Sequence, residues 1–333
     1  MRDNRNLLLM KTLHRICMAL GLAAGLGSTL PAVAQPYPAK PIRIIVPFAP
    51  GGPADLLART LGQKLQESWG QPVLADNKPG AGGNLGMDLG AKAAPDGYTL
   101  LLAPTGNLTV NPHLGPLPYD VMRDLAPVTQ LASVENVLVV NPGIAANNVQ
   151  ELVALARGKP GSLSFASPGA GSQAHVAGEF LKGMTGTDLI HIAYKGTGPA
   201  LNDLLGGQVS MMFSQMSSAL PHIRAGKLRA LGVASLKRSA LLPALPTVAE
   251  QNLAGFEAVS WYALMAPAGT PADVIAKLQV ESARILRLAD VREKLAGLGA
   301  EAVGNRPEEL AAIMRAESAR WQKVVKDANI KAE

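Results

Sequence analysis

One pattern recurs along this chain and limits what it can fold into. An apolar run of strand character is followed by a loop rich in Gly, Pro and Ser, and then by a stretch of helical character. The loops of this pattern lie at residues 47–53, 79–84, 167–172 and 195–199. Strands that alternate with helices in this way predict an α/β fold with a mainly parallel sheet.

The first copy shows the pattern most clearly. Residues 42–46 are β-branched and almost wholly apolar, as expected of a strand covered on both faces, and residues 54–68 have helical periodicity. Each such loop places free backbone N–H groups at a helix start, where the helix dipole favours an anion. The same loops are also compatible with ordinary strand-to-helix connections, and the pattern alone does not decide between the two interpretations.

The remaining chain predicts the same alternation without a low-complexity linker. Further strands are expected at residues 73–75, 98–103, 163–167, 188–194, 209–213, 228–234 and 261–265. Further helices are expected at 84–94, 149–157, 173–184, 200–205, 271–287 and 307–326, with a loop at 214–218 leading to another helix that ends at Arg224. The long apolar stretches 134–140 and 228–235 are candidates for strands that cross between two domains. The predicted division is residues 35–135 and 236–333 for the first lobe and residues 136–235 for the second.

The N-terminus has the three parts of a secretory signal peptide. Four basic residues precede an apolar run that begins at Ile16, and the run ends in the A-x-A site Ala32-Val33-Ala34. The run is too short for a membrane anchor, so we expect residues 1–34 to be cleaved and the mature protein to be periplasmic. Met10 is an alternative start.

Composition excludes several classes of function for the mature chain. The leader carries a net charge of +3 out of the +6 of the whole chain, and aromatic residues make up 4%, which argues against nucleic-acid binding. The only cysteine, Cys17, leaves with the leader, so no disulfide or thiolate metal site is expected. The histidines His113, His175, His191 and His222 are widely spaced, and no metal or other cofactor is predicted.

No catalytic or nucleotide-binding motif is complete. The P-loop, the dinucleotide fingerprint and the nucleophile elbow are all missing from the Gly-rich loops. Asp55 lies in a first helical turn, where it is either a carboxylate that suits the helix dipole or an acceptor for a ligand or ordered water. His175 and Lys195 likewise suit structural or solvated roles as well as binding roles. An enzyme is therefore not predicted.

Several blocks, taken together over essentially the whole mature chain, resemble the Bug family. These proteins are the extracytoplasmic solute receptors of tripartite tricarboxylate transporters. The blocks are "YPAKPIRIIVPFAPGGPAD" at 37–55, "DNKPGAGGNLG" at 76–86, "PDGYTL" at 95–100, "SQAHVAGE" at 172–179, "YKGTGPA" at 194–200, "DLLGGQV" at 203–209 and "LPHIRAGKLRA" at 220–230.

The resemblance implies a type II periplasmic-binding-protein fold, whose two lobes close on a ligand like a flytrap. It implies a small carboxylate or related polar metabolite as ligand, docked against the turn 47–53, often with bridging waters. By the same resemblance, the first-lobe wall is Phe48, Ala49, Gly51, Gly52 and Asp55, with Gly82, Gly83 and Thr105 nearby. The second lobe would supply Ser167, Gly171, Ser172, His175, Tyr194, Lys195, Pro199, Ala200, Asp203 and Gln215.

The chain departs from the commoner family pattern at Gln173-Ala174 and at Ser214-Gln215, beside the expected pocket. The identity of the ligand therefore cannot be taken from relatives. The expected partners are integral-membrane transporter subunits, and a monomer is expected. Two alternatives remain at this point: a sensing receptor that docks on a membrane signalling kinase and, more remotely, a periplasmic enzyme with Asp55 or His175 as base.

Overall fold

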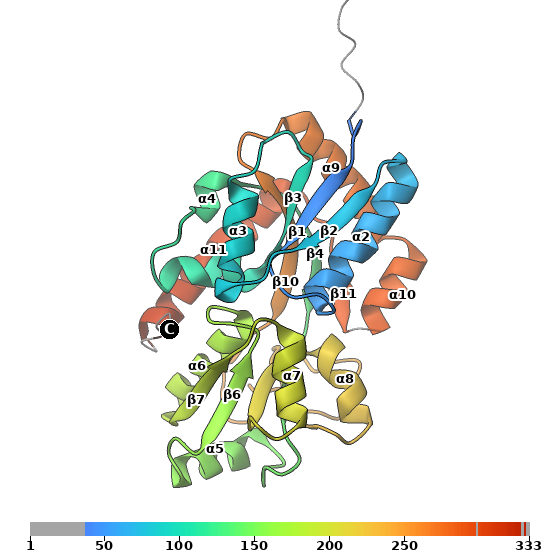
Figure 1. Ribbon diagram of the computed structural model, residues 1–333. Helices are drawn as coiled ribbons and strands as arrows, with labels where there is room; N and C mark the ends of the chain where they lie inside the picture. The colour runs from blue at the N-terminus through green and yellow to red at the C-terminus, as the bar shows by residue number, and fades with distance from the viewer. Residues whose placement is uncertain (1–36, 298, 328–329, 331–333) are drawn as a thin grey trace, which may run out of the picture. The chain divides into compact units, whose positions relative to one another are not determined.

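The computed structural model describes residues 37–297, 299–327 and 330 (Figure 1). The predicted signal peptide, residues 1–34, lies outside these described residues. Lys40 to Glu333 form one compact unit, and every described strand and helix belongs to it.

The first of two sheets has six strands in the order β11-β4-β10-β3-β1-β2. Their bounds are β1 (Ile42–Val46), β2 (Val73–Asn77), β3 (Thr99–Pro104), β4 (Leu125–Val134), β10 (Ser260–Pro267) and β11 (Ala300–Ala302). The parallel part is β2-β1-β3, whereas β10 runs antiparallel to both β3 and β4, and β11 runs antiparallel to β4.

The second sheet has five strands in the order β7-β6-β8-β5-β9. Their bounds are β5 (Asn136–Val140), β6 (Leu163–Ser167), β7 (Leu189–Ala193), β8 (Met211–Gln215) and β9 (Arg229–Val233). Here β6 pairs in parallel with β7 and β8, and β5 pairs antiparallel with β8 and β9. We call the parts built on the first and second sheets the first lobe and the second lobe.

The predicted two-lobed α/β architecture is present, but both sheets are mixed rather than mainly parallel. The reason lies in the connections between the sheets. The strands through which the chain enters a sheet after a crossing, β5 and β10, run antiparallel to neighbours that were reached through a helix. Local sequence pattern shows that a strand exists but carries no information about this direction.

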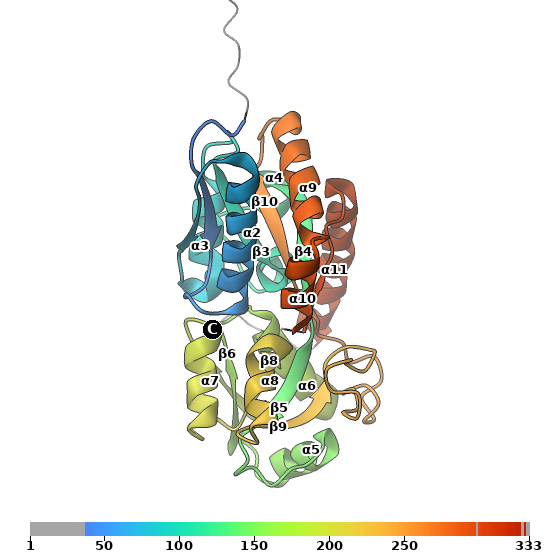
Figure 2. The same cartoon turned by 90° about the vertical axis from the view of Figure 1, so that its right-hand side faces the viewer.

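Helices flank each sheet, as Figures 1 and 2 show. With the first sheet lie α2 (Pro53–Trp69), α3 (Asn84–Ala91), α4 (Val121–Asp124), α9 (Ala272–Leu286), α10 (Ala289–Gly297) and α11 (Pro307–Asp327). With the second sheet lie α5 (Val149–Gly158), α6 (Gln173–Thr185), α7 (Thr197–Leu205) and α8 (Met216–Arg224). Three single turns complete the list: η1 (Ala81–Gly83), η2 (Gly106–Val110) and η3 (Asn111–His113).

Most predicted elements are present, with some corrections. The loop predicted at 214–218 is instead the end of β8 followed directly by α8, and α7 begins at Thr197 rather than at residue 200. The elements α4, β4, α10 and β11 were not predicted as separate elements, although the end of β4 belongs to the long apolar stretch that continues into β5. Only Val291 and Leu295 of α10 are buried, and β11 is three residues long, so neither carries a strong periodic pattern.

Each lobe has its own apolar core. In the first lobe, Ile45 and Leu101 of the sheet pack in one cluster with Met87 of α3 and Leu310 of α11. Fully burying such a side chain stabilises a fold by about 1.5–3 kcal/mol. The strands hold the loop residues that follow them on rigid supports, which is what a binding site requires.

The chain crosses between the lobes at two places that are bonded to each other. Only Glu135 separates β4 from β5, and residues 234–259 lead back from β9 to β10. The side-chain amide of Asn136 donates to the carbonyl of Ala258 (2.6 Å) and to Ser260 Oγ (2.9 Å). The first crossing lies within the predicted stretch 134–140, at Glu135, and the second begins at the end of the predicted stretch 228–235. In neither case does one strand span the two sheets, because β5 and β9 both lie wholly within the second sheet.

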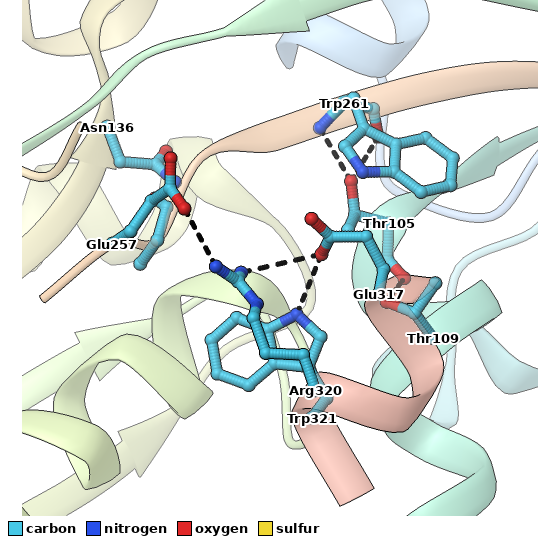
Figure 3. Close-up of polar contacts among 9 residues, drawn as sticks. Thr105, Thr109, Asn136, Glu257, Trp261, Glu317, Arg320 and Trp321 are labelled. Carbon is cyan, nitrogen blue, oxygen red and sulfur yellow. Dashed lines mark hydrogen bonds and ion pairs between the residues drawn. The ribbon is translucent and has the colours of Figure 1, made fainter. Parts of the chain in front are cut away.

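Helix α11 holds the returning segment in place (Figure 3). Arg320 donates to the carboxylate of Glu257 at 2.8 Å and lies 3.4 Å from that of Glu317. The indole of Trp321 donates to Glu317 at 3.0 Å, and its ring meets Phe180 of α6 edge to face. Helix α11 therefore contacts both the crossing segment and the second lobe. No helix in the described part of the chain combines the length and the apolar character needed to cross a membrane.

Candidate ligand-binding cleft

A cavity lies between the two lobes, with about 620 Å³ of empty space when the solvent at its mouth is included. Its wall consists of residues 48–49, 52–54, 104–107, 136, 168, 172–174, 197, 212–213, 215 and 260–262. Both lobes and the first crossing contribute. None of these wall residues is charged, although ten of them have polar side chains or an indole N–H.

The starts of four helices lie on this wall. They are Gly52–Ala54 of α2, Ser172–Ala174 of α6, Thr197 of α7 and Gln215 before α8. The first N–H groups of a helix have no acceptor within the helix, and the dipole gives this end a partial positive charge. Four such ends around one uncharged cavity suit an anion without help from a lysine or arginine.

The turn 47–52 is held in shape from behind. The Asp55 carboxylate accepts hydrogen bonds from the backbone N–H of Gly51 and from Arg59 Nε, both at 3.0 Å. Asn77 Nδ2 donates to the carbonyl of Phe48 at 3.0 Å. Burial alone would raise the pKa of Asp55, but the bonds from Arg59, Gly51 and Asn77 outweigh it and lower the pKa. Asp55 is buried and faces its own turn rather than the cavity wall.

The loop 168–172 of the second lobe is held by two histidines. His175 Nδ1 accepts from the N–H of Gly171 at 3.0 Å, and Ser167 Oγ accepts from the N–H of Gly169 at 3.1 Å. His191 Nε2 lies 2.7 Å from Ser167 Oγ, and its ring stacks on that of His175 at 4.1 Å. Burial, helped by the charge of Lys182, lowers the pKa of His191 to about 4, so His191 is neutral at pH 7.

Thr105 positions Trp261 at the cavity wall through two hydrogen bonds. Its hydroxyl donates to the Trp261 carbonyl at 2.7 Å and accepts from the Trp261 N–H at 2.6 Å (Figure 3). These two bonds tie the end of β3 to the start of β10. They also place the Trp261 indole at the cavity wall, where its Nε1 has no hydrogen-bond partner in the described part of the chain.

The predicted site residues fall into three groups. Those on the wall of this cavity are Phe48, Ala49, Gly52, Thr105, Ser172 and Gln215. A second interlobe cavity next to it shares Phe48 and is lined by Gly82, Gly83, Gly171, Tyr194 and Lys195, among others. Neither wall includes Gly51, Asp55, Ser167, His175, Pro199, Ala200 or Asp203.

Several residues of the third group support the loops instead. Asp203 accepts a hydrogen bond from the Tyr194 hydroxyl at 2.7 Å, and Ala200 is buried within α7. Pro199 is exposed. Asp55, Ser167 and His175 hold the loops described above. Contact of any predicted residue with a ligand stays a prediction.

The wall also includes residues that the sequence did not single out as site residues. They are Asn107, Asn136, Gln173, Ser260, Trp261 and Tyr262, among others. Gln173 was noted only as a departure from the family pattern. The sequence at the start of β10 indicated only a buried strand. Its position in the cleft could not be predicted, because it depends on a hydrogen bond to Thr105, 156 residues earlier. Within the described residues, no group of three or more His, Cys, Asp or Glu side chains is placed to hold a metal ion.

Two α/β lobes with a cleft of helix starts and neutral polar side chains define a solute-binding receptor of the periplasmic-binding-protein class. Residues 57–330 match the model of the tripartite tricarboxylate transporter family receptor. The chain belongs to this family, and the resemblance seen in the sequence is confirmed. The family is one of receptors rather than enzymes.

The relatives agree in sequence and in structure. Protein BugT of Bordetella pertussis is 42% identical over 320 residues, which cover 95% of this chain and 98% of BugT. The solved structure of the periplasmic binding protein BugD is 36% identical, with a TM-score of 0.85 over 89% of this chain and 100% of BugD. MatC of Rhodopseudomonas palustris, solved with bound malate, is 34% identical, with a TM-score of 0.84 over 87% of this chain and 100% of MatC. An R. palustris protein solved with adipate is 35% identical, with a TM-score of 0.85 over 89% of this chain and 99% of that protein.

Proposed function

We propose that this protein captures a small carboxylate in the interlobe cavity and presents it to integral-membrane subunits of a tripartite tricarboxylate transporter. The observation that carries the proposal is the meeting of four helix starts on an uncharged wall. Relatives of the same fold hold malate and adipate, which supports a carboxylate here. Enclosing the anion between two lobes removes water and strengthens its hydrogen bonds to backbone N–H groups.

We also propose that the chain is exported and acts in the periplasm as a monomer after cleavage behind Ala34. The predicted signal peptide and the periplasmic class of its relatives support this location. Expression of the full chain in a Gram-negative host, followed by periplasmic extraction, tests it. N-terminal sequencing should begin at Gln35, and a product that stays in the cytoplasm would contradict export.

Calorimetry on the exported protein tests the ligand class. The panel consists of small mono- and dicarboxylates, each paired with its methyl ester. At least one acid should bind with micromolar or better affinity, and its ester should bind at least tenfold more weakly, because the helix starts stabilise a negative charge. Equal affinity for the acid and its ester would show that the cavity does not recognise a carboxylate.

A substitution at Gly52 links the binding to this cavity. Gly52 lies on the wall, has an ordinary φ of −81°, and a Cβ there would meet nothing closer than the Ala49 carbonyl at 3.9 Å. Gly52→Val should therefore fold normally and yet lose affinity by at least tenfold, since the side chain takes ligand space. Gly198→Val is the matched control: Gly198 lies near the start of α7 off both cavity walls, with open space for a Cβ.

The membrane partner can be identified separately. Ligand shifts the population of a two-lobed receptor toward closure, and the closed form is the one that a partner can recognise. Crosslinking in native membranes with and without ligand should recover a multi-spanning permease in the liganded sample. Recovery of a signalling kinase instead would replace transport by sensing.

A further inference from the structure

The cavity wall carries an unusual share of the polar atoms that lack a partner. Among the described residues, eleven buried side-chain N and O atoms have no hydrogen bond, and five of these belong to wall residues. They are Asn107 Oδ1, both carboxamide atoms of Gln173, Gln215 Oε1 and Trp261 Nε1. A buried polar atom left without a bond costs about 1–3 kcal/mol, so such a cluster at one cavity indicates groups that a ligand satisfies.

Gln173 is the most informative of the four residues. It is the first residue of α6 and is only 6% exposed, and neither Oε1 nor Nε2 has a partner. Oxygen and nitrogen of a carboxamide are assigned from their surroundings rather than observed. That ambiguity does not matter here, because either orientation leaves one donor and one acceptor to be satisfied.

Asn107 adds an acceptor whose identity is fixed. Its Nδ2 donates to the carbonyl of Gly82 and to Asn84 Oδ1, each at 3.0 Å. The Gly82 carbonyl can only accept, so the amide cannot be turned round, and Oδ1 is the atom left without a partner. The orientation of the Gln215 carboxamide is not fixed in this way, because its partner is the hydroxyl of Tyr262, which can donate or accept.

A carboxylate alone cannot form hydrogen bonds to all of these atoms. An ionised carboxylate only accepts hydrogen bonds, so it can satisfy Trp261 Nε1 or one atom of Gln173 but not Asn107 Oδ1. A second carboxylate would also find no cation on the wall. The acceptors on the wall require a hydrogen-bond donor, which either a ligand or a bound water can supply.

We propose that the ligand carries one carboxylate and, at its other end, a neutral group that both donates and accepts hydrogen bonds. A carboxamide or a hydroxyl is of this kind, and Gln173 is the specificity-determining residue that recognises it. This inference rests on the proposed function, in which the helix starts hold the carboxylate. By this inference, the ligand preference of this protein differs from that of a receptor that prefers unmodified dicarboxylates.

Matched pairs of acids test the proposal by calorimetry on the exported protein at pH 7. Each pair consists of a dicarboxylate and its monoamide: succinate with succinamate, glutarate with glutaramate, and adipate with adipamate. In the pair whose length fits best, the monoamide should bind at least tenfold more tightly. A dicarboxylate that binds as tightly as its monoamide would overturn the inference.

Gln173→Met then assigns the preference to one side chain. Methionine has nearly the same length and volume but offers no comparable donor or acceptor. The variant should lose at least tenfold in affinity for the monoamide and less than threefold for butyrate, which has no second polar end. The same change at Gln63, on the exposed face of α2, should alter neither affinity.

The outcomes separate the two proposals. If no carboxylate in the panel binds to the wild-type protein, the proposed function fails. If carboxylates bind but Gln173→Met leaves the monoamide affinity unchanged, or weakens both ligands equally, Gln173 does not read a second polar group. Water would then satisfy its carboxamide, and the inference alone would fall.

Discussion

Gly82 of the first lobe lies in backbone contact with Ala170 of the second, so closely that a Cβ on Gly82 would lie 2.0 Å from the Ala170 carbonyl oxygen. Gly106 and Gly171 approach in a similar way, with 2.6 Å between a Cβ on Gly106 and the Gly171 oxygen. The lobes therefore meet through glycine backbones beside the cavity. Closure of the cleft depends on the absence of side chains at these points.

Gly82→Ala should hold the lobes apart. Its Cβ would collide with the Ala170 backbone, which cannot move aside like a flexible side chain, so ligand affinity should fall at least tenfold. Calorimetry with the best carboxylate measures the affinity, and small-angle scattering should show that added ligand no longer reduces the radius of gyration.

Gly70→Ala is the matched control for backbone strain. Gly70 ends α2 with φ 68°, close to the 61° of Gly82, but a Cβ there meets nothing within 4 Å. It should cost about 1 kcal/mol of stability, as expected for a non-glycine residue in the left-handed region, and leave affinity unchanged. Equal losses of affinity in the two variants would show that strain, not contact between the lobes, is responsible.

Asp55→Ala should loosen the turn 47–52 without touching the ligand directly. It leaves the N–H of Gly51 without its acceptor and removes the carboxylate partner of Arg59, so urea unfolding should show a loss of about 1–3 kcal/mol. Affinity should fall as well, because the backbone N–H groups of the turn lose their fixed positions. Unchanged affinity in a destabilised variant would separate the turn from binding.

The contribution of the Asp55 carboxylate to the stability of the fold depends on pH. The pKa of Asp55 is lowered in the folded protein, so its contribution to stability is fully present above the unfolded value, about pH 4. That contribution is lost as pH falls through the lower folded pKa. The stability difference between wild type and Asp55→Ala should therefore be constant from pH 5 to pH 8 and shrink only below about pH 4.

Thr105→Val should displace Trp261. Valine keeps the shape of threonine but removes the hydroxyl that bonds both the N–H and the carbonyl of Trp261. Leaving these buried groups unpaired costs about 1–3 kcal/mol each at most, and the fluorescence of the indole should change. Thr105→Ser keeps the hydroxyl and should retain most of the affinity, whereas equal losses in the two variants would show that affinity does not depend on the two hydroxyl bonds to Trp261.

Stability should fall as pH drops from about 6.5 toward 4 because of His191. Its folded pKa of about 4 lies below the ordinary value of about 6.5, so in this window the unfolded chain binds more protons than the folded one. The full effect is at most about 3.5 kcal/mol, from about 1.4 kcal/mol for each pKa unit. Protonation would also make His191 Nε2 a hydrogen-bond donor, so Ser167 Oγ would have to accept at the contact that helps to hold the loop 168–172.

Urea unfolding at pH 7.5, 6.5, 5.5 and 4.5 measures this slope. In His191→Phe, which keeps an aromatic ring beside His175 and Phe165, the slope should be shallower than in the wild type. His113, whose pKa burial also lowers, is present in both proteins and cancels in the comparison. An identical slope in the two proteins would assign the acid sensitivity to other groups.

Much of the fold follows from local pattern. The strands β1 and β6 and the helices α2, α5 and α6 begin and end close to where apolar runs, Gly/Pro loops and helical periodicity place them. These features depend on residues within a few positions of one another, so they can be read along the chain. The same is true of the turn 47–53, whose placement at a helix start needs no knowledge of the rest of the molecule.

The composition of the cleft depended on tertiary structure. Asp55 and Gly52 are three residues apart, yet only Gly52 lies on the cavity wall, because Arg59 and the Gly51 N–H hold the carboxylate on the other side of the turn. Trp261 reaches the wall only through Thr105, and Asn136 only through the crossing between the lobes. The direction of β10 was equally hidden, because it is set by where the chain returns from the second lobe.

The sequence by itself therefore determined the family, the alternation of strands and helices, and the Gly-rich turns at four strand ends. Only the tertiary structure decided which of those turns share a cavity and which neutral side chains, Gln173 above all, are left without partners there. The physical reason is the distance along the chain over which the deciding interactions act. Periodicity and capping act over a few residues, whereas a cavity wall is assembled from hydrogen bonds and packing between segments more than a hundred residues apart.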